Sequence, residues 1–412
     1  MIQFPLKRIT ICTLLLFMSV LAACGGGSDE IMATATGGQV GPNDFVITAM
    51  PPAPHWVEAA AVITGENASN MSFLGRLDAP GAISTLFDYA FSPDGTRLAA
   101  LNNDYLLLWD LINGQLIASN TRQGASHIFY SADKSEIYTL DTEGDTLVFD
   151  TEQVIRQADF LAHTDFSGVA TYYDEDGWLA VGGRYGSVKV WDPIERVSLV
   201  TLEADDVEIT RLAFSDDGQL LATMNKDGIV RVWNWREREI ISVMGREDET
   251  IGLMAFSPDG QELAVAANAY IAVWDVSDGS LVYYLQSGRG AASNVLVYSP
   301  DGRYILSGGF APGMILWDAE SGELLFLLEG VGGERVSAAF SPDGTLLLAS
   351  ALDGPVTMWG MAGSTGETLT RANLSVGTER VLFVDWSPDG YLMTFFDASA
   401  PVYVWGIAAE TE

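Results

Sequence analysis

The sequence is poor in the residues that build metal, disulfide and nucleic-acid sites. It holds two cysteines and three histidines among 412 residues, and they are scattered. A zinc site of Cys and His ligands would need most of them in one place, so we expect no metal and no cofactor. Lys and Arg total 21 against 55 Asp and Glu, a formal charge of −34. This balance argues against nucleic-acid binding, which needs clustered cations, and favours a cationic partner.

The N-terminus lacks a run long enough to cross a membrane. Residues 9–23 are uncharged, which is 15 residues, whereas a membrane-spanning helix needs about 20. Lys7 and Arg8 stand directly before this run. A short basic start followed by a short apolar run is typical of a secretory signal.

The end of this run adds a membrane anchor to the prediction. Residues 21–28 read Leu-Ala-Ala-Cys-Gly-Gly-Gly-Ser, which resembles the bacterial lipoprotein signal. The resemblance implies removal of residues 1–23 and acylation of Cys24. The alternative is an ordinary cleaved signal, which would leave Cys24 as a lone thiol. Cleavage leaves 19 basic against 55 acidic residues, a charge of −36.

We therefore expect an extracytoplasmic lipoprotein, either on the cell surface or in a periplasm. Residues 24–55 are rich in Gly, Ala, Thr and Pro, and this composition predicts a flexible tether. Residues 56–412 remain for the folded domain.

A turn pattern recurs eight times in that domain. Ser-Pro-Asp-Gly begins at Ser92, Ser257, Ser299, Ser341 and Ser387. Weaker copies begin at Ser131, Asp174 and Ser215. The third positions of successive copies lie 39, 43, 41, 42, 42, 42 and 46 residues apart. An aromatic column follows each third position by 15 or 16 residues: Trp109, Phe149, Trp191, Trp233, Trp274, Trp317, Trp359 and Trp405.

Each unit reads as four short strands separated by turns. Several strands are apolar at consecutive positions, which indicates that both faces of each sheet are buried. Four strands every 40–45 residues, with Trp-Asp near the end of the third, resemble the WD40 repeat. The resemblance covers residues 60–408 and implies an all-β fold, the β-propeller.

The ends of the array predict how the ring closes. Only seven residues follow Trp405, too few for a fourth strand, and residues 71–77 look like a fourth strand without its first three. WD40 propellers close by lending such an N-terminal strand to the last blade, here residues 380–408. Eight units predict eight blades; seven is the alternative, because seven is common in the family and the second unit is degenerate.

Catalytic patterns are weak in this sequence. We find no Gly-x-Ser-x-Gly elbow, no His-Glu-x-x-His and no phosphate loop. His163 occupies the position of the WD40 histidine, where the family uses it for hydrogen bonding, although its blade has Tyr185 in place of the usual Asp. The hydrogen-bond network of the family is incomplete in every blade. The Ser-Pro-Asp-Gly turns offer one carboxylate each, too few for calcium.

The turns between second and third strands form the candidate binding face, because exposed aromatic residues in loops favour partner binding. This prediction comprises Asp104, Tyr185, Asp227, Tyr270, Phe310, Asp353 and Asp397. Packing of these residues on neighbouring blades is the alternative.

Three functions remain after these observations. The first is a monomeric, non-enzymatic scaffold that binds a protein or peptide outside the cytoplasm. The second is an accessory lipoprotein of envelope assembly machinery, in which eight-bladed propellers occur. The third is a propeller enzyme with a cofactor in its channel; the quinone-dependent dehydrogenases of this shape stack a cysteine pair on the cofactor, and this chain has no such pair.

Overall fold

The structure is a computed structural model that describes most of the domain and one short segment before it. The described residues are 45–47, 56–78, 86–121, 124–245, 251–267, 270–285, 293–309, 313–329, 331, 336–351, 354–361, 370–374, 380–397 and 401–408. The signal, Cys24 and almost all of the predicted tether lie outside them.

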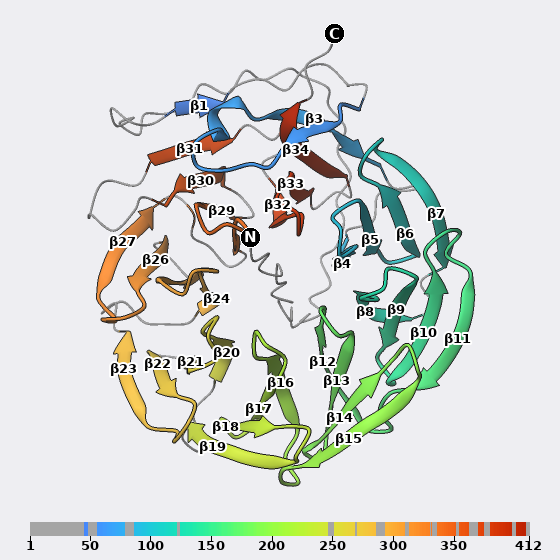
Figure 1. The fold of residues 1–412 in the computed structure, drawn as a ribbon, viewed down its shortest axis with the longest axis vertical. Helices are drawn as coiled ribbons and strands as arrows, with labels where there is room; N and C mark the ends of the chain where they lie inside the picture. Colours follow the sequence, from blue (N-terminus) through green and yellow to red (C-terminus); the bar gives the residue numbers. More distant parts are fainter. Residues whose placement is uncertain are drawn as a thin grey trace, which may run out of the picture.

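Eight sheets, each built on antiparallel strands, stand radially around a central axis (Figure 1). Within each sheet we name the strands a to d from the axis outward. Blade one consists of β4 (Asp88–Phe91), β5 (Arg97–Leu101), β6 (Tyr105–Asp110) and β7 (Gln115–Thr121). Blade two consists of β8 (Ala125–Tyr130), β9 (Glu136–Asp141), β10 (Asp145–Asp150) and β11 (Arg156–Leu161). Blade three consists of β12 (Phe166–Tyr173), β13 (Trp178–Gly183), β14 (Ser187–Asp192) and β15 (Val197–Glu203).

Blades four to six repeat this order. Blade four consists of β16 (Ile209–Phe214), β17 (Leu220–Asn225), β18 (Ile229–Asn234) and β19 (Glu239–Gly245). Blade five consists of β20 (Ile251–Phe256), β21 (Glu262–Ala267), β22 (Ile271–Asp275) and β23 (Leu281–Leu285). Blade six consists of β24 (Ser293–Tyr298), β25 (Tyr304–Gly309), β26 (Gly313–Asp318) and β27 (Leu324–Glu329).

Blades seven and eight include N-terminal strands. Blade seven consists of β28 (Val336–Phe340), β29 (Leu346–Ala351), β30 (Val356–Gly360), β31 (Thr370–Leu374) and, outside it, β1 (Phe45–Ile47). Blade eight consists of β32 (Val381–Trp386), β33 (Leu392–Asp397) and β34 (Val402–Ala408), with β2 (Ala59–Ala61) and β3 (Ser72–Leu77) both paired to β34. A short 3-10 turn, Ala68–Asn70, precedes β3. The prediction of eight blades is confirmed, and the alternative of seven is wrong.

The Ser-Pro-Asp-Gly turns are held by a local hydrogen-bond pattern. Ser92 Oγ donates to Asp94 Oδ1 at 2.6 Å, and the Thr96 N–H donates to the same oxygen at 3.1 Å. Gly95 has φ of +71°, which a glycine adopts without strain. The same Ser-to-Asp bond, 2.5 to 2.8 Å long, recurs at Ser131, Ser215, Ser257, Ser299, Ser341 and Ser387. Two of the weaker copies therefore form the same turn as the strong ones.

Ring closure follows the predicted route. β3 pairs antiparallel with β34, from Ser72 opposite Gly406 to Leu77 opposite Val402. The residues before β3 add a second contact, between the N-terminal segment and blade one. Trp56 Nε1 donates to the Ile112 carbonyl at 2.7 Å, and its ring lies so close to Gly114 that a Cβ there would stand 2.0 Å away.

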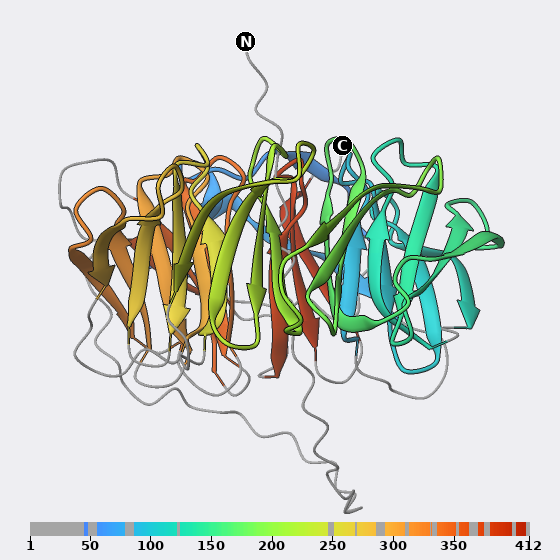
Figure 2. The ribbon, with the colours of Figure 1, turned by 90° about the horizontal axis from the view of Figure 1, so that it is seen from below.

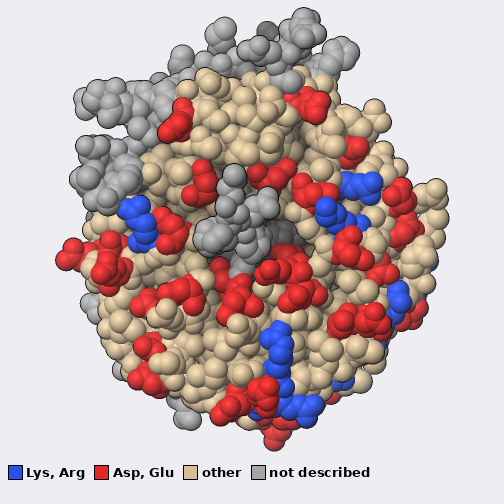
Figure 3. Space-filling view, in the orientation of Figure 1, with Lys and Arg blue, Asp and Glu red and all other residues tan. Residues whose placement is uncertain are grey.

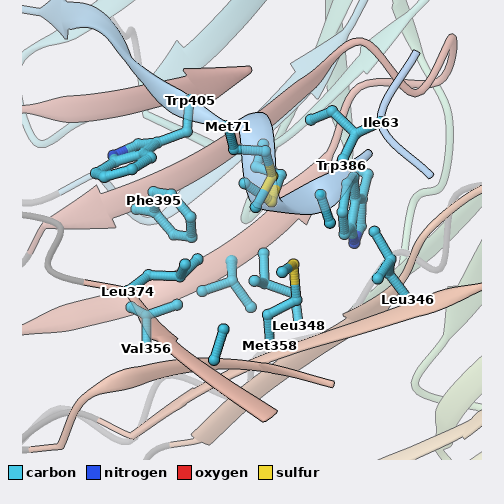
Figure 4. Packing of buried hydrophobic residues seen from close by; sticks show 14 of the residues in the cluster. Ile63, Met71, Leu346, Leu348, Val356, Met358, Leu374, Trp386, Phe395 and Trp405 are labelled. Carbon is cyan, nitrogen blue, oxygen red and sulfur yellow. The ribbon is translucent and has the colours of Figure 1, made fainter. Parts of the chain in front are cut away.

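The core is divided among the eight blade interfaces. Each of eight apolar clusters contains buried residues from two adjacent blades. Figure 4 shows the cluster between blades seven and eight, where Ile63 and Met71 of the N-terminal segment pack with Trp386 and Trp405. This arrangement agrees with strands that are apolar on both faces.

Candidate functional site

The molecule is a ring with two distinct faces (Figure 2). Because successive strands of a blade are antiparallel, the a–b and c–d turns lie on one face, which we call the Ser-Pro-Asp-Gly face. The b–c turns lie on the other, which we call the b–c face.

Acidic side chains gather around the centre of the Ser-Pro-Asp-Gly face (Figure 3). The a–b turns contribute carboxylates in a fixed geometry, since in seven of the eight turns the aspartate accepts a hydrogen bond from the serine two residues before it. Burial raises the pKa of Asp94, but hydrogen bonds from Ser92 and Thr96 outweigh it and hold that pKa below its usual range. Among the described residues, no group of three or more His, Cys, Asp or Glu side chains could hold a metal ion.

The residues predicted for the b–c face fall into four groups. Asp104, Tyr185 and Asp227 are exposed. Tyr270 is half-buried and packs edge-on against Tyr284, with ring centroids 5.0 Å apart. Phe310 and Asp353 lie outside the described residues. Asp397 ends β33 and is only 3% exposed, so its carboxylate is not presented to a partner.

Tyr185 is the most prominent of these side chains. It is 65% exposed, the largest exposed fraction among the large hydrophobic residues of the described chain. It sits in the turn between β13 and β14, where Gly186 has φ of +77° and the Arg184 N–H donates to the Asp165 carbonyl at 2.7 Å. The ring therefore projects from a turn with a fixed backbone.

This turn is coupled to the next blade through Asp205. A Cβ at Gly186 would stand 1.5 Å from the Asp205 carbonyl oxygen, so the two backbones are in direct contact. Asp205 Oδ2 accepts from Arg231 at 2.7 Å and from Asn225 at 3.2 Å. Asn225 in turn accepts the Ile229 N–H at 2.9 Å, across the turn that carries Asp227. Blades three and four thus form one rigid platform.

His163 has a structural role in this platform's blade. Its Nδ1 accepts the Asp165 N–H at 3.1 Å, which places the ring proton on Nε2, 3.1 Å from Ser187 Oγ. The histidine is therefore a donor to this serine and not its base. Burial lowers the pKa of His163, which keeps the ring neutral at pH 7.

The family network is partial, as the sequence predicts. Trp233 Nε1 donates to Thr223 Oγ1 at 3.0 Å, and Trp317 Nε1 donates to Ser307 Oγ at 2.8 Å. Trp191 donates instead to the Ala162 carbonyl at 2.9 Å. The eight apolar interfaces carry most of the packing between blades.

One cluster on the Ser-Pro-Asp-Gly face was not predicted. The guanidinium of Arg236 lies 4.1 Å from the Trp178 ring centroid and 4.3 Å from that of Trp235, a cation–π arrangement. Both tryptophans stand outside the repeated aromatic column, and this departure was the only signal in the sequence. The arginine covers the ring of Trp178, which is half-buried.

The remaining predictions concern residues that the structure does not describe. Cys24 and the apolar run before it lie outside the described residues. Within the described part of the chain, no helix has the length and apolar character that a membrane crossing needs.

Comparison with known proteins supports the class of fold. Residues 179–256 match the family model of the anaphase-promoting complex subunit 4 WD40 domain. The structure resembles the C-terminal WD40 domain of Sif2 (TM-score 0.65, 14% identity, 82% of this chain and 99% of that one). It also resembles the computationally designed Ika8 protein (TM-score 0.64, 20% identity, 80% and 99%). No curated protein matches the sequence.

These findings define a WD40-type β-propeller with eight blades. At these identities the solved structures establish the fold alone. The fold is consistent with a scaffold for protein interactions.

Proposed function

We propose that this protein is a non-enzymatic scaffold that binds a cationic protein or peptide segment on its b–c face. The observation that carries the proposal is Tyr185, exposed on a turn that Asp165, Gly186 and Asp205 hold in place. An aromatic ring on a fixed backbone loses little conformational freedom on binding and contributes a large contact area.

The charge of this face supports the choice of partner. Asp104 and Asp227 are exposed carboxylates on b–c turns. Lys226 is 2.9 Å from Glu208, and Arg231 is 2.7 Å from Asp205, so these two cations pair with carboxylates of the protein itself. Arg184, next to Tyr185, is an exposed cation of the same face. The remaining carboxylates favour lysine or arginine on the partner.

The hydrogen bonds of His163 support a non-enzymatic role. Its Nδ1 lone pair is occupied by a backbone N–H, and its Nε2 proton points to Ser187. A serine nucleophile requires the opposite direction, with the hydroxyl donating to the imidazole. The His163–Ser187 pair therefore forms a structural hydrogen bond and lacks the arrangement of a catalytic Ser–His pair.

A capture experiment tests the binding face. Tagged protein is recovered from solubilised membranes, and its partner is identified by mass spectrometry. We expect Tyr185→Ala to reduce recovery of that partner at least fivefold. Tyr391→Ala is the matched control, because Tyr391 is also exposed but stands directly before β33, beside the Ser-Pro-Asp-Gly turn. Equal recovery with both variants would place the working surface elsewhere.

We further propose that acylated Cys24 holds the propeller outside the cytoplasm. The lipoprotein-like residues 21–28 support this location. Cys24→Ser should release the protein into the soluble fraction and abolish labelling with a radioactive fatty acid. A mutant that stays with the membrane, beside a wild type that takes up no label, would refute the anchor.

A further inference from the structure

The outer edge of blade seven differs from that of every other blade. In seven blades the strand pair c–d, or its counterpart β34–β3, has an irregular register beside the repeated aromatic column. The β30–β31 pair is regular throughout its described length, with Trp359 directly opposite Arg371. Bulges twist an edge strand and interrupt its pairing, whereas a regular edge can accept another strand.

This regular edge carries an additional strand outside its fourth strand. β1 pairs in parallel with β31, so that Phe45, Val46 and Ile47 lie opposite Ala372, Asn373 and Leu374. Figure 1 shows β1 outside β31 at the rim of the ring. The occupant is thus a segment of the chain that the sequence assigns to the tether.

The direction of β1 determines where the tether leaves the ring. β31 starts at the Ser-Pro-Asp-Gly face, because it follows a c–d connection, and β1 runs parallel to it. Phe45 therefore lies at the end of β1 nearer the Ser-Pro-Asp-Gly face. From Cys24 to Phe45 the chain spans 21 residues, compared with 32 to Trp56. At about 3.5 Å per residue, the reach falls from ~110 Å to ~75 Å.

We propose that the edge of β31 is a docking site for residues 45–47, and that docking fixes the tether's exit and shortens its reach. A docked tether leaves from the end of β1 nearer the Ser-Pro-Asp-Gly face, which favours orientations that turn this face toward the membrane and leave the b–c face free. The consequence for orientation rests on the proposed anchor, whereas the docking itself does not.

A disulfide in the soluble Cys24→Ser protein tests the docking. Cys12→Ser is included as well, so that Val46→Cys and Asn373→Cys are the only cysteines whether or not the signal is cleaved. Adjacent strands lie about 4.8 Å apart, within the Cα separation that a disulfide spans. We expect an intramolecular disulfide in most of the protein under mild oxidation. The matched control pairs Val46→Cys with Arg371→Cys, two residues out of register, and should cross-link at least fivefold less.

Three outcomes would overturn the docking proposal. Equal cross-linking of the two pairs would indicate a tether without a register. The absence of any cross-link would remove β1 from this edge. A disulfide-linked dimer would show that the edge accepts the strand of a second copy instead.

The orientation is tested separately with the lipid-anchored protein in liposomes. A fluorophore is attached at Gln261→Cys, beside a Ser-Pro-Asp-Gly turn, or at Lys226→Cys on the b–c face. A quencher on the lipid headgroups should quench the Gln261→Cys label at least twofold more, and Phe45→Pro with Ile47→Pro should abolish the difference. Equal quenching in the protein with an intact β1 would refute the orientation. Failure of the liposomes to retain the protein would instead refute the anchor.

Discussion

At the scale of single residues, His127 is a histidine whose surroundings clearly disfavour its charged form. Burial lowers the pKa of His127 to about 4. Its ring lies between Phe129 and Phe166, with centroids 6.4 and 6.0 Å away. Ser126 Oγ is 2.9 Å from its Nδ1 and donates to the Leu140 carbonyl at 3.1 Å. Neither aromatic ring can stabilise an added proton as a carboxylate would.

This lowered pKa predicts an acid-sensitive fold. The unfolded chain takes up a proton on His127 near pH 6.5, whereas the folded protein does so only near pH 4. The free energy of unfolding should therefore fall as the pH drops from about 6.5 to 4. His127→Phe removes one titrating group and should make that fall shallower. Urea unfolding at a series of pH values measures both slopes, and equal slopes would contradict the assignment.

At the scale of strands, the sequence predicts the turns that are held by hydrogen bonds between neighbouring residues. The turn serine and aspartate bond within a few residues of each other, so the pattern Ser-Pro-Asp-Gly marks each a–b turn directly. The burial of Asp397 and the contact of Trp56 with Gly114 depend on residues far apart in the chain. Such contacts leave no periodic signal, and the same is true of the pairing of β1 with β31.

Strand β3 is the element on which ring closure depends most. Leu74 and Leu77 of β3 are fully buried in the cluster between blades eight and one. Deletion of residues 71–77 removes this packing and exposes the edge of β34, which favours aggregation.

We expect that deletion to lower the melting temperature by more than 10 °C or to give insoluble protein. Arg76→Ala is the control, since Arg76 is the exposed residue of the same strand and forms an ion pair with Asp78. Circular dichroism during heating measures both proteins. A deletion variant as stable as this control would mean that another segment closes the ring.

At the scale of the whole molecule, charge is the property most readily predicted from composition. A formal charge of −34 must be spread over the surface, and Figure 3 shows acidic side chains across one face, several of them around its centre. Composition does not say which face binds. Our proposal of the b–c face rests on the turn of Tyr185, which contacts Asp205 through Gly186 between blades three and four. Only the folded chain reveals this contact.

The separation of charge and aromatic contact predicts two kinetic effects on partner binding. Asp104→Lys with Asp227→Lys should slow association several-fold, because exposed charges act mainly on the encounter of two proteins. Salt should weaken wild-type binding and affect this variant less, since charges are screened beyond about 10 Å at 0.1 M.

Tyr185→Ala should instead raise the dissociation rate, because a buried aromatic anchor holds a complex once it has formed. Surface plasmon resonance with the captured partner separates the two rates. If the charge variant changed only dissociation, or if salt weakened both proteins equally, Asp104 and Asp227 would not be the carboxylates that meet the partner.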